Sequence, residues 1–111
     1  MSHIDKTIFE ELKRMSGGDF INELIDAFVE DGPTMLQNMQ AALEARDAES
    51  FRRNAHSLKS NANTFGATRL GILARELEVM GRENNFNVGD RLEVLKKSFE
   101  EVAEELQGLR V

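Results

Sequence analysis

One histidine in this chain has a lysine, a serine and an asparagine near it at helical spacing. His56, Lys59, Ser60 and Asn63 occupy positions i, i+3, i+4 and i+7, which are neighbours on the surface of a helix. A neutral imidazole nitrogen is a competent nucleophile, and a lysine ammonium can stabilise an anion beside it. The sequence therefore places a nucleophile, a positive charge and a compact side chain within one or two helical turns.

The helix that must position these residues has an apolar face on its other side. At about 100° per residue, spacings of four, three, four and three keep one set of side chains in a single stripe. That stripe consists of Phe51, Ala55, Leu58, Ala62 and Phe65. The stripe predicts that the helix packs against a core and that His56 points away from it.

The run from His56 to Gly66 resembles the signature of histidine-containing phosphotransfer (HPt) domains. It reads His-x-Leu-Lys-Ser-x-Ala-x-x-Phe-Gly. The resemblance implies that His56 carries a phosphoryl group between aspartates of response-regulator receiver domains, with Lys59 beside that group. It also implies that the small residue at position 60 leaves room for the partner and that Gly66 ends the helix. Ser60 departs from the family, in which glycine is most frequent there, but serine is compact and we expect the role to be kept.

Length and composition predict one globular domain over residues 1–111. Apolar residues make up 41% and charged residues 31%, which is not the balance of a disordered chain. The formal net charge of -6 argues against nucleic acid and anionic lipid as partners, since both favour a basic face. The chain has no cysteine, no apolar run long enough to span a bilayer and no signal-peptide pattern, so we expect a cytoplasmic protein.

The first half of the chain predicts a short helix followed by a long one. Residues from Asp5 to about Met15 form the short helix, and Ser16-Gly17-Gly18 should break it. Asp19 is the expected cap of the next helix. Gly32-Pro33 should interrupt that helix, yet the apolar stripe continues in phase beyond it, which favours one long helix with a kink.

The second half predicts three more helices. Asp47 should cap the motif helix, which runs to about Phe65, and a helix starting at Thr68 carries apolar residues as far as Met80. A polar linker from Gly81 to Asn87 leads to a last helix with a bundle seam from Leu92 to Leu106. We therefore predict an all-α fold: an antiparallel four-helix bundle with a short additional N-terminal helix.

Several other residues are candidates for contact with a partner. Arg52 lies one turn before His56 and could meet an acidic partner or simply be solvated, and Asn63 could be a secondary contact. Ile8 and Leu12 of the first helix are candidates for the apolar part of a docking surface. Phe20 and Leu24 could add to that surface, although for Leu12 a place in the bundle core is an equally good prediction.

The expected reaction partners follow from what the chain lacks. It has no Gly-rich phosphate loop for ATP and no histidine or cysteine spacing for a metal, so we expect no cofactor. As the resemblance implies, the receiver would supply Mg²⁺ and the aspartate. We predict a monomeric phosphocarrier, not an enzyme, that works with response-regulator receivers, a hybrid histidine kinase, or both. We also expect no base near His56, so that the phosphohistidine hydrolyses slowly.

Two other classes of protein stay open at this point. A helical adaptor could carry the same motif with His56 unmodified. A histidine-kinase dimerisation module could build a bundle from two chains, but it usually has an acidic residue directly after the histidine, where this chain has Ser57.

Overall fold

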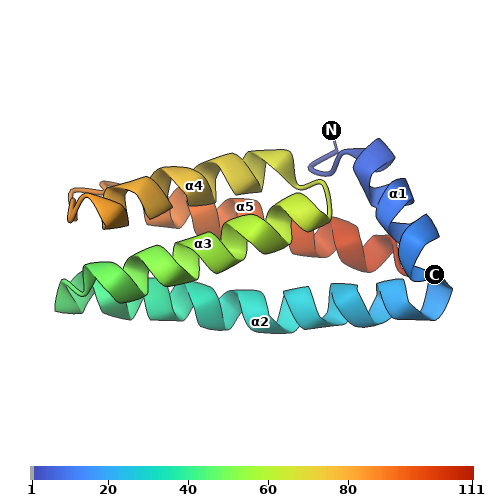
Figure 1. Cartoon of the computed structure of the whole chain (residues 1–111), viewed down its shortest axis with the longest axis horizontal. Coiled ribbons are helices and arrows are strands. Elements are labelled where there is room, and N and C mark those ends of the chain that lie inside the picture. The colour runs from blue at the N-terminus through green and yellow to red at the C-terminus, as the bar shows by residue number, and fades with distance from the viewer. Residues whose placement is uncertain (1) are drawn as a thin grey trace.

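The structure is a computed structural model that describes residues 2–111. Four helices form an elongated bundle in which consecutive helices run in opposite directions, and a short first helix crosses one end of it (Figure 1). No strand occurs among residues 2–111. The predicted fold class is confirmed. The helices are α1 (Lys6–Ser16), α2 (Gly18–Ala45), α3 (Ala48–Thr64), α4 (Thr68–Arg82) and α5 (Arg91–Gly108).

Two aspartates cap helices: Asp47, as predicted, and Asp5, where the sequence predicts the start of a helix. The side chain of Asp5 accepts hydrogen bonds from the backbone N–H groups of Thr7 and Ile8, at 2.9 and 3.3 Å. Asp47 caps α3 by accepting from the N–H of Ser50 at 3.1 Å. These bonds satisfy backbone donors that have no partner within the helix, so both helix starts are encoded locally.

The predicted cap of the second helix, α2, is wrong. Gly17 alone separates α1 from α2, and its φ of 84° lies in the left-handed region that favours glycine. Its N–H also bonds to the carbonyl of Lys13, so one glycine ends the first helix and starts the second. Asp19 lies inside the first turn of α2, where a negative charge interacts favourably with the helix dipole.

The helix α2 continues through Pro33, as the phase of its apolar stripe indicates. The backbone at Gly32 approaches the ring of Phe99 so closely that a Cβ atom there would lie 2.1 Å from ring carbons. That ring packs against Phe28, with centroids 5.2 Å apart, and Phe28 packs in turn against Phe65 at the same distance. Gly32 thus lets α5 pack directly on α2, while the kink itself stays a prediction.

Close contact between α3 and α4 explains why the predicted linker begins too early. Gly81 and Arg82 belong to α4, and the connection to α5 covers residues 83–90. A Cβ atom at Gly81 would lie 3.1–3.2 Å from the backbone of Arg52. Glycine is needed here for close helix packing rather than for a turn, and this close approach sets the distance between the two helices that carry the site.

Residues 2–6 at the N-terminus are held against the end of α5. The carboxylate of Glu105 accepts hydrogen bonds from the Ser2 hydroxyl at 2.5 Å and from the His3 backbone N–H at 2.7 Å. Lys6 lies 3.2 Å from the same group. Burial alone would raise the pKa of Glu105, but these three contacts outweigh it and the pKa lies below its ordinary value.

Among residues 2–111, no helix has both the length and the apolar character that crossing a membrane requires.

Candidate functional site

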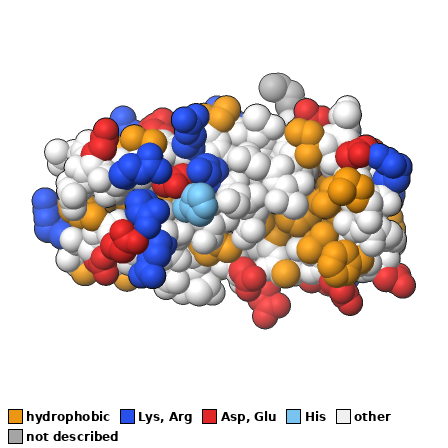
Figure 2. All heavy atoms as spheres, in the orientation of Figure 1, with side chains coloured by type: hydrophobic (Ala, Val, Ile, Leu, Met, Phe, Trp, Pro, Cys, Tyr) orange, Lys and Arg blue, Asp and Glu red, His pale blue; other side chains and the backbone are white. Residues whose placement is uncertain are grey.

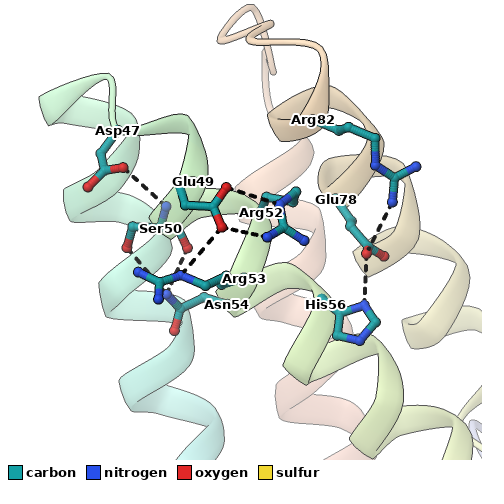
Figure 3. A network of polar contacts seen from close by, with 9 residues as sticks. All are labelled: Asp47, Glu49, Ser50, Arg52, Arg53, Asn54, His56, Glu78 and Arg82. Atoms are coloured by element: carbon teal, nitrogen blue, oxygen red, sulfur yellow. Dashed lines mark hydrogen bonds and ion pairs between the residues drawn. The ribbon is translucent and has the colours of Figure 1, made fainter.

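His56 projects from the middle of α3, as predicted, and 53% of its side chain is exposed. Its Nδ1 lies 2.8 Å from Oε2 of Glu78 on α4, in a hydrogen bond that joins the two helices (Figure 3). The exposed edge of the imidazole is therefore the one that carries Nε2, while the other edge is fixed by a carboxylate.

Glu78 lies at the site but is not among the residues that the sequence predicts for it. Only 3% of its side chain is exposed, and three cationic or titratable side chains contact it. A signal was present in the sequence: Glu78 continues the spacing of Gly71, Ala74 and Gly81, small residues that α4 packs closely toward its neighbours. A charged residue within such a seam has to be paired, because an isolated buried charge is very unfavourable.

The ionisation of Glu78 determines which nitrogen of His56 carries the proton. Burial opposes ionisation of Glu78, but its contacts with Lys59 and His56 outweigh burial and hold its pKa below the ordinary value. An ionised carboxylate can only accept hydrogen bonds, so Nδ1 of His56 is assigned as the donor. The lone pair is then on Nε2, which faces solvent.

The expectation that no base lies near His56 is wrong, because the carboxylate of Glu78 is in direct contact with the ring. The carboxylate is on the Nδ1 side, however, and it is already engaged by that N–H. Its position suits it to orient the imidazole and stabilise positive charge on the ring, as a carboxylate does for the histidine of a catalytic triad.

Lys59 lies on the same side of α3 as His56, as its spacing predicts, and 23% of its side chain is exposed. Its Nζ lies 2.7 Å from Oε1 of Glu78. Oε1 is buried, and Lys59 is its partner in this ion pair. Lys59 is thus held beside His56 by its contact with the buried carboxylate.

Arginines surround this site although the whole chain is acidic. Arg52 lies one turn before His56, and its guanidinium bonds to Glu49 at 2.6 Å. Arg82 follows Glu78 by one turn and is 62% exposed, with Nη2 3.5 Å from Oε2 of Glu78. Figure 2 shows Lys and Arg side chains gathered over the first half of α3 and the second half of α4.

The small and amide residues of the motif lie further along α3. Ser60 is exposed one turn after His56, as predicted. Asn63 is also exposed, but its side chain lies against Gly71 of α4, where a Cβ atom would be 2.2 Å from Asn63 Oδ1. Asn63 therefore has a packing role between the helices, and a role in partner contact stays a prediction.

An apolar surface continues beyond these residues at the α1 end of the molecule. Ile8 is 40% exposed and Phe20 is 51% exposed, whereas Leu12 and Leu24 are half-buried against the core. Apolar side chains gather there over α1 and the start of α2 (Figure 2). The Cβ of Ile8 would lie 3.0 Å from a Cβ at Gly66, so α1 packs against the end of the motif helix.

No cluster of three histidine, cysteine, aspartate or glutamate side chains that could hold a metal ion occurs in the part of the chain that the structure describes.

This combination of an exposed histidine and a helical bundle matches one protein family. The family model of the Hpt domain matches residues 23–110, so this chain belongs to the Hpt domain family. The chain is accordingly a histidine phosphotransfer module of a two-component phosphorelay, a carrier rather than a catalytic enzyme fold.

Known proteins agree with this assignment. The crystal structure of histidine-containing phosphotransfer protein B from Pseudomonas aeruginosa PAO1 superposes with a TM-score of 0.87 at 28% identity, covering 97% of this chain and 94% of that one. The HPT domain of a sensor hybrid histidine kinase from Shewanella has a TM-score of 0.79 at 14% identity, over 96% of this chain and 92% of that one, and supports the fold alone.

A curated relative is the multistep phosphorelay regulator 1 of Schizosaccharomyces pombe, 26% identical over 106 residues. The match covers 93% of this chain but only 34% of that protein. The chain therefore corresponds to about a third of this relative's length.

Proposed function

We propose that His56 is the residue that carries the phosphoryl group and that Nε2 is the atom to which phosphorus binds. The observation that supports this most directly is the contact between Nδ1 and Glu78 at 2.8 Å, which leaves the Nε2 lone pair exposed. His3 is the other histidine, and its backbone N–H bonds to Glu105. Among residues 2–111, no hydrogen bond orients its ring.

In the transfer step, Nε2 of His56 attacks the phosphorus of a receiver's phosphoaspartate in line with the bond that breaks. The Nε2–P bond forms, the P–O bond to the aspartate breaks, and the aspartate leaves as a carboxylate. The proton stays on Nδ1, so the ring gains positive charge that the Glu78 carboxylate stabilises. The reverse step passes the phosphoryl group to an aspartate in the same way.

Lys59 stabilises the phosphoryl oxygens. Its ammonium is one turn from His56, and a hydrogen bond from a charged donor is typically worth ~1.5–3 kcal/mol. The phosphohistidine persists because the one carboxylate in contact with the ring is engaged by Nδ1–H and does not face the phosphorus. Water near Nε2 therefore meets no general base from Glu78.

The receiver docks over α3, where the short side chain of Ser60 lets the receiver backbone approach His56. Ile8 and Leu12 supply the apolar part of the dock, together with Phe20 and Leu24, whose exposed or half-buried positions at the α1 end support this. Asn63 lies between that part and the histidine. Arg52, one turn before His56 on α3, adds positive charge on the side of the histidine away from Asn63.

The remaining chemistry belongs to the partner. The receiver supplies the aspartate and Mg²⁺, and this chain binds neither ATP nor a cofactor of its own. The partners are response-regulator receivers, a hybrid histidine kinase, or both, and the chain works as a monomer. A cytoplasmic location and a single domain over residues 1–111 stay predictions.

A transfer experiment tests this function. A receiver domain is phosphorylated with radiolabel and mixed with the chain, and the product is checked for acid-labile, base-stable label. Label should appear on the wild type and on the matched control His3→Gln, and be absent from His56→Gln. Undiminished labelling of His56→Gln overturns the proposal. Receiver binding without label on any variant would point to a helical adaptor.

A further inference from the structure

Glu78 is buried beside the histidine that acquires the phosphoryl group, and its charge must stay balanced through that change. In the unmodified state it contacts His56 and Lys59 closely, at 2.8 and 2.7 Å, and Arg82 more distantly at 3.5 Å. A phosphoryl group on Nε2 adds about two negative charges at neutral pH. Lys59, one helical turn from His56 on α3, is a cation that could serve this group, and it now pairs with Glu78.

Lys59 cannot fully serve both anions at once. If its ammonium turns to the phosphoryl oxygens, Oε1 of Glu78 loses the cation that contacts it at 2.7 Å. That oxygen is buried. Removing one partner of a buried ion pair is strongly unfavourable, because the remaining charge is left uncompensated.

Arg82 is placed to replace Lys59. It follows Glu78 by four residues on α4, and this spacing keeps two side chains on one face of a helix. Its guanidinium is mostly exposed and touches only the carboxylate oxygen that His56 already uses (Figure 3). A planar guanidinium has several N–H donors and can bind both oxygens of a carboxylate. Once Lys59 has turned away, Oε1 can accept a hydrogen bond from Arg82.

We propose that Arg82 is a positioning residue that takes over as the counter-ion of Glu78 when Lys59 turns to the phosphoryl group on His56. This inference rests on the function proposed above. Arg82 lies outside the histidine motif. In the exchange, the carboxylate of Glu78 loses Lys59, gains Arg82 and keeps its hydrogen bond with Nδ1–H of His56.

The charges around Glu78 limit which groups could act instead. His56 and Lys59 face it from α3 and Arg82 from its own helix. Arg52 of α3 also interacts with Glu78 through its charge, but its guanidinium is bonded to Glu49. Besides Lys59, the cation that Arg82 would replace, Arg82 is within contact distance of the carboxylate and pairs with no other acidic side chain among residues 2–111.

The exchange can be tested first without any phosphoryl group. The pKa of the Glu78 carboxyl is measured by ¹³C NMR in wild type, Lys59→Ala, Arg82→Gln and the double variant. If Arg82 replaces Lys59, the pKa rises only modestly in either single variant and rises much more in the double variant. Equal pKa values in Lys59→Ala and the double variant would overturn the inference.

The second measurement uses potassium phosphoramidate, which can phosphorylate histidine without a receiver. The yield and lifetime of phosphohistidine should fall about three- to ten-fold in Arg82→Gln. Loss of one charged contact predicts about tenfold, and solvent screening of the exposed Arg82 reduces this effect. Arg82→Lys should recover part of the loss, because it keeps the charge. Arg69→Gln is the matched control: an exposed arginine on the same helix, about 13 Å along its axis from Glu78.

If the yield and lifetime of phosphohistidine in Arg82→Gln equal those of the wild type, the inference is contradicted. Phosphorylation of His56 would stand in that case. Absence of label from a phosphorylated receiver on wild-type protein would instead contradict the proposed function. The two failures are therefore separate, because the ¹³C titration requires neither a receiver nor a phosphoryl group.

Discussion

Glu78 and His56 are 22 residues apart in the chain, yet Oε2 of the glutamate lies 2.8 Å from Nδ1 of the histidine. The contact joins α3 to α4 at the point where Gly81 brings the two helices close together. A buried carboxylate thus contacts an exposed imidazole. The geometry of the site depends on helix packing as well as on the motif.

Replacing Glu78 by Gln should slow phosphotransfer about tenfold, because a neutral amide oxygen accepts a weaker hydrogen bond and does not stabilise positive charge on the ring. Transfer rates from a phosphorylated receiver provide the measurement. Glu76→Gln, an exposed glutamate on the same helix, is the control. If both variants transfer at the wild-type rate, Glu78 has no role in orienting the histidine.

Glu78 should also contribute to acid sensitivity. Its folded-state pKa is lowered from the ordinary 4.5 because its contacts with Lys59 and His56 outweigh burial. The stabilisation is therefore fully present above the unfolded pKa and is lost as the pH falls through the folded pKa. Wild-type protein should lose more unfolding free energy than Glu78→Gln between about pH 5 and pH 3. Urea titrations across that range measure it, and parallel curves would contradict it.

Lys59→Ala should slow transfer in both directions about tenfold without abolishing it, since one charged contact to the phosphoryl group is lost. Single-turnover rates to and from a receiver, at low ionic strength, give the result. Lys97→Ala on α5 controls for the loss of one positive charge. Wild-type rates in Lys59→Ala would show that this lysine has no role in transfer.

Ser60→Arg should weaken receiver binding and phosphotransfer together, because a long side chain one turn from His56 stands where the partner backbone approaches. Ser60→Gly should be tolerated, and both variants should melt near the wild-type temperature since position 60 is exposed. Chemical-shift mapping with an unphosphorylated receiver checks the location. Shifts centred on Ser60 and α1 support the proposed dock, whereas shifts confined to the far end, near Asn84, contradict it.

The helices and the local arrangement of the motif could be predicted from the sequence alone. Helical periodicity identified the four bundle helices, and Asp5 and Asp47 marked two of the starts because capping bonds span only two or three residues. The neighbourhood of His56, Lys59 and Ser60 was equally predictable, since residues three and four apart on one helix are always neighbours.

The residue that contacts the motif from the neighbouring helix could not be predicted in this way. Glu78 meets His56 because α3 and α4 pack at one particular register, which depends on side chains along the whole interface and on the close approach at Gly81. Glu105 likewise binds residues about a hundred positions earlier in the chain. Sequence spacing fixes geometry within a helix, whereas contacts between helices depend on how all of their apolar faces pack together.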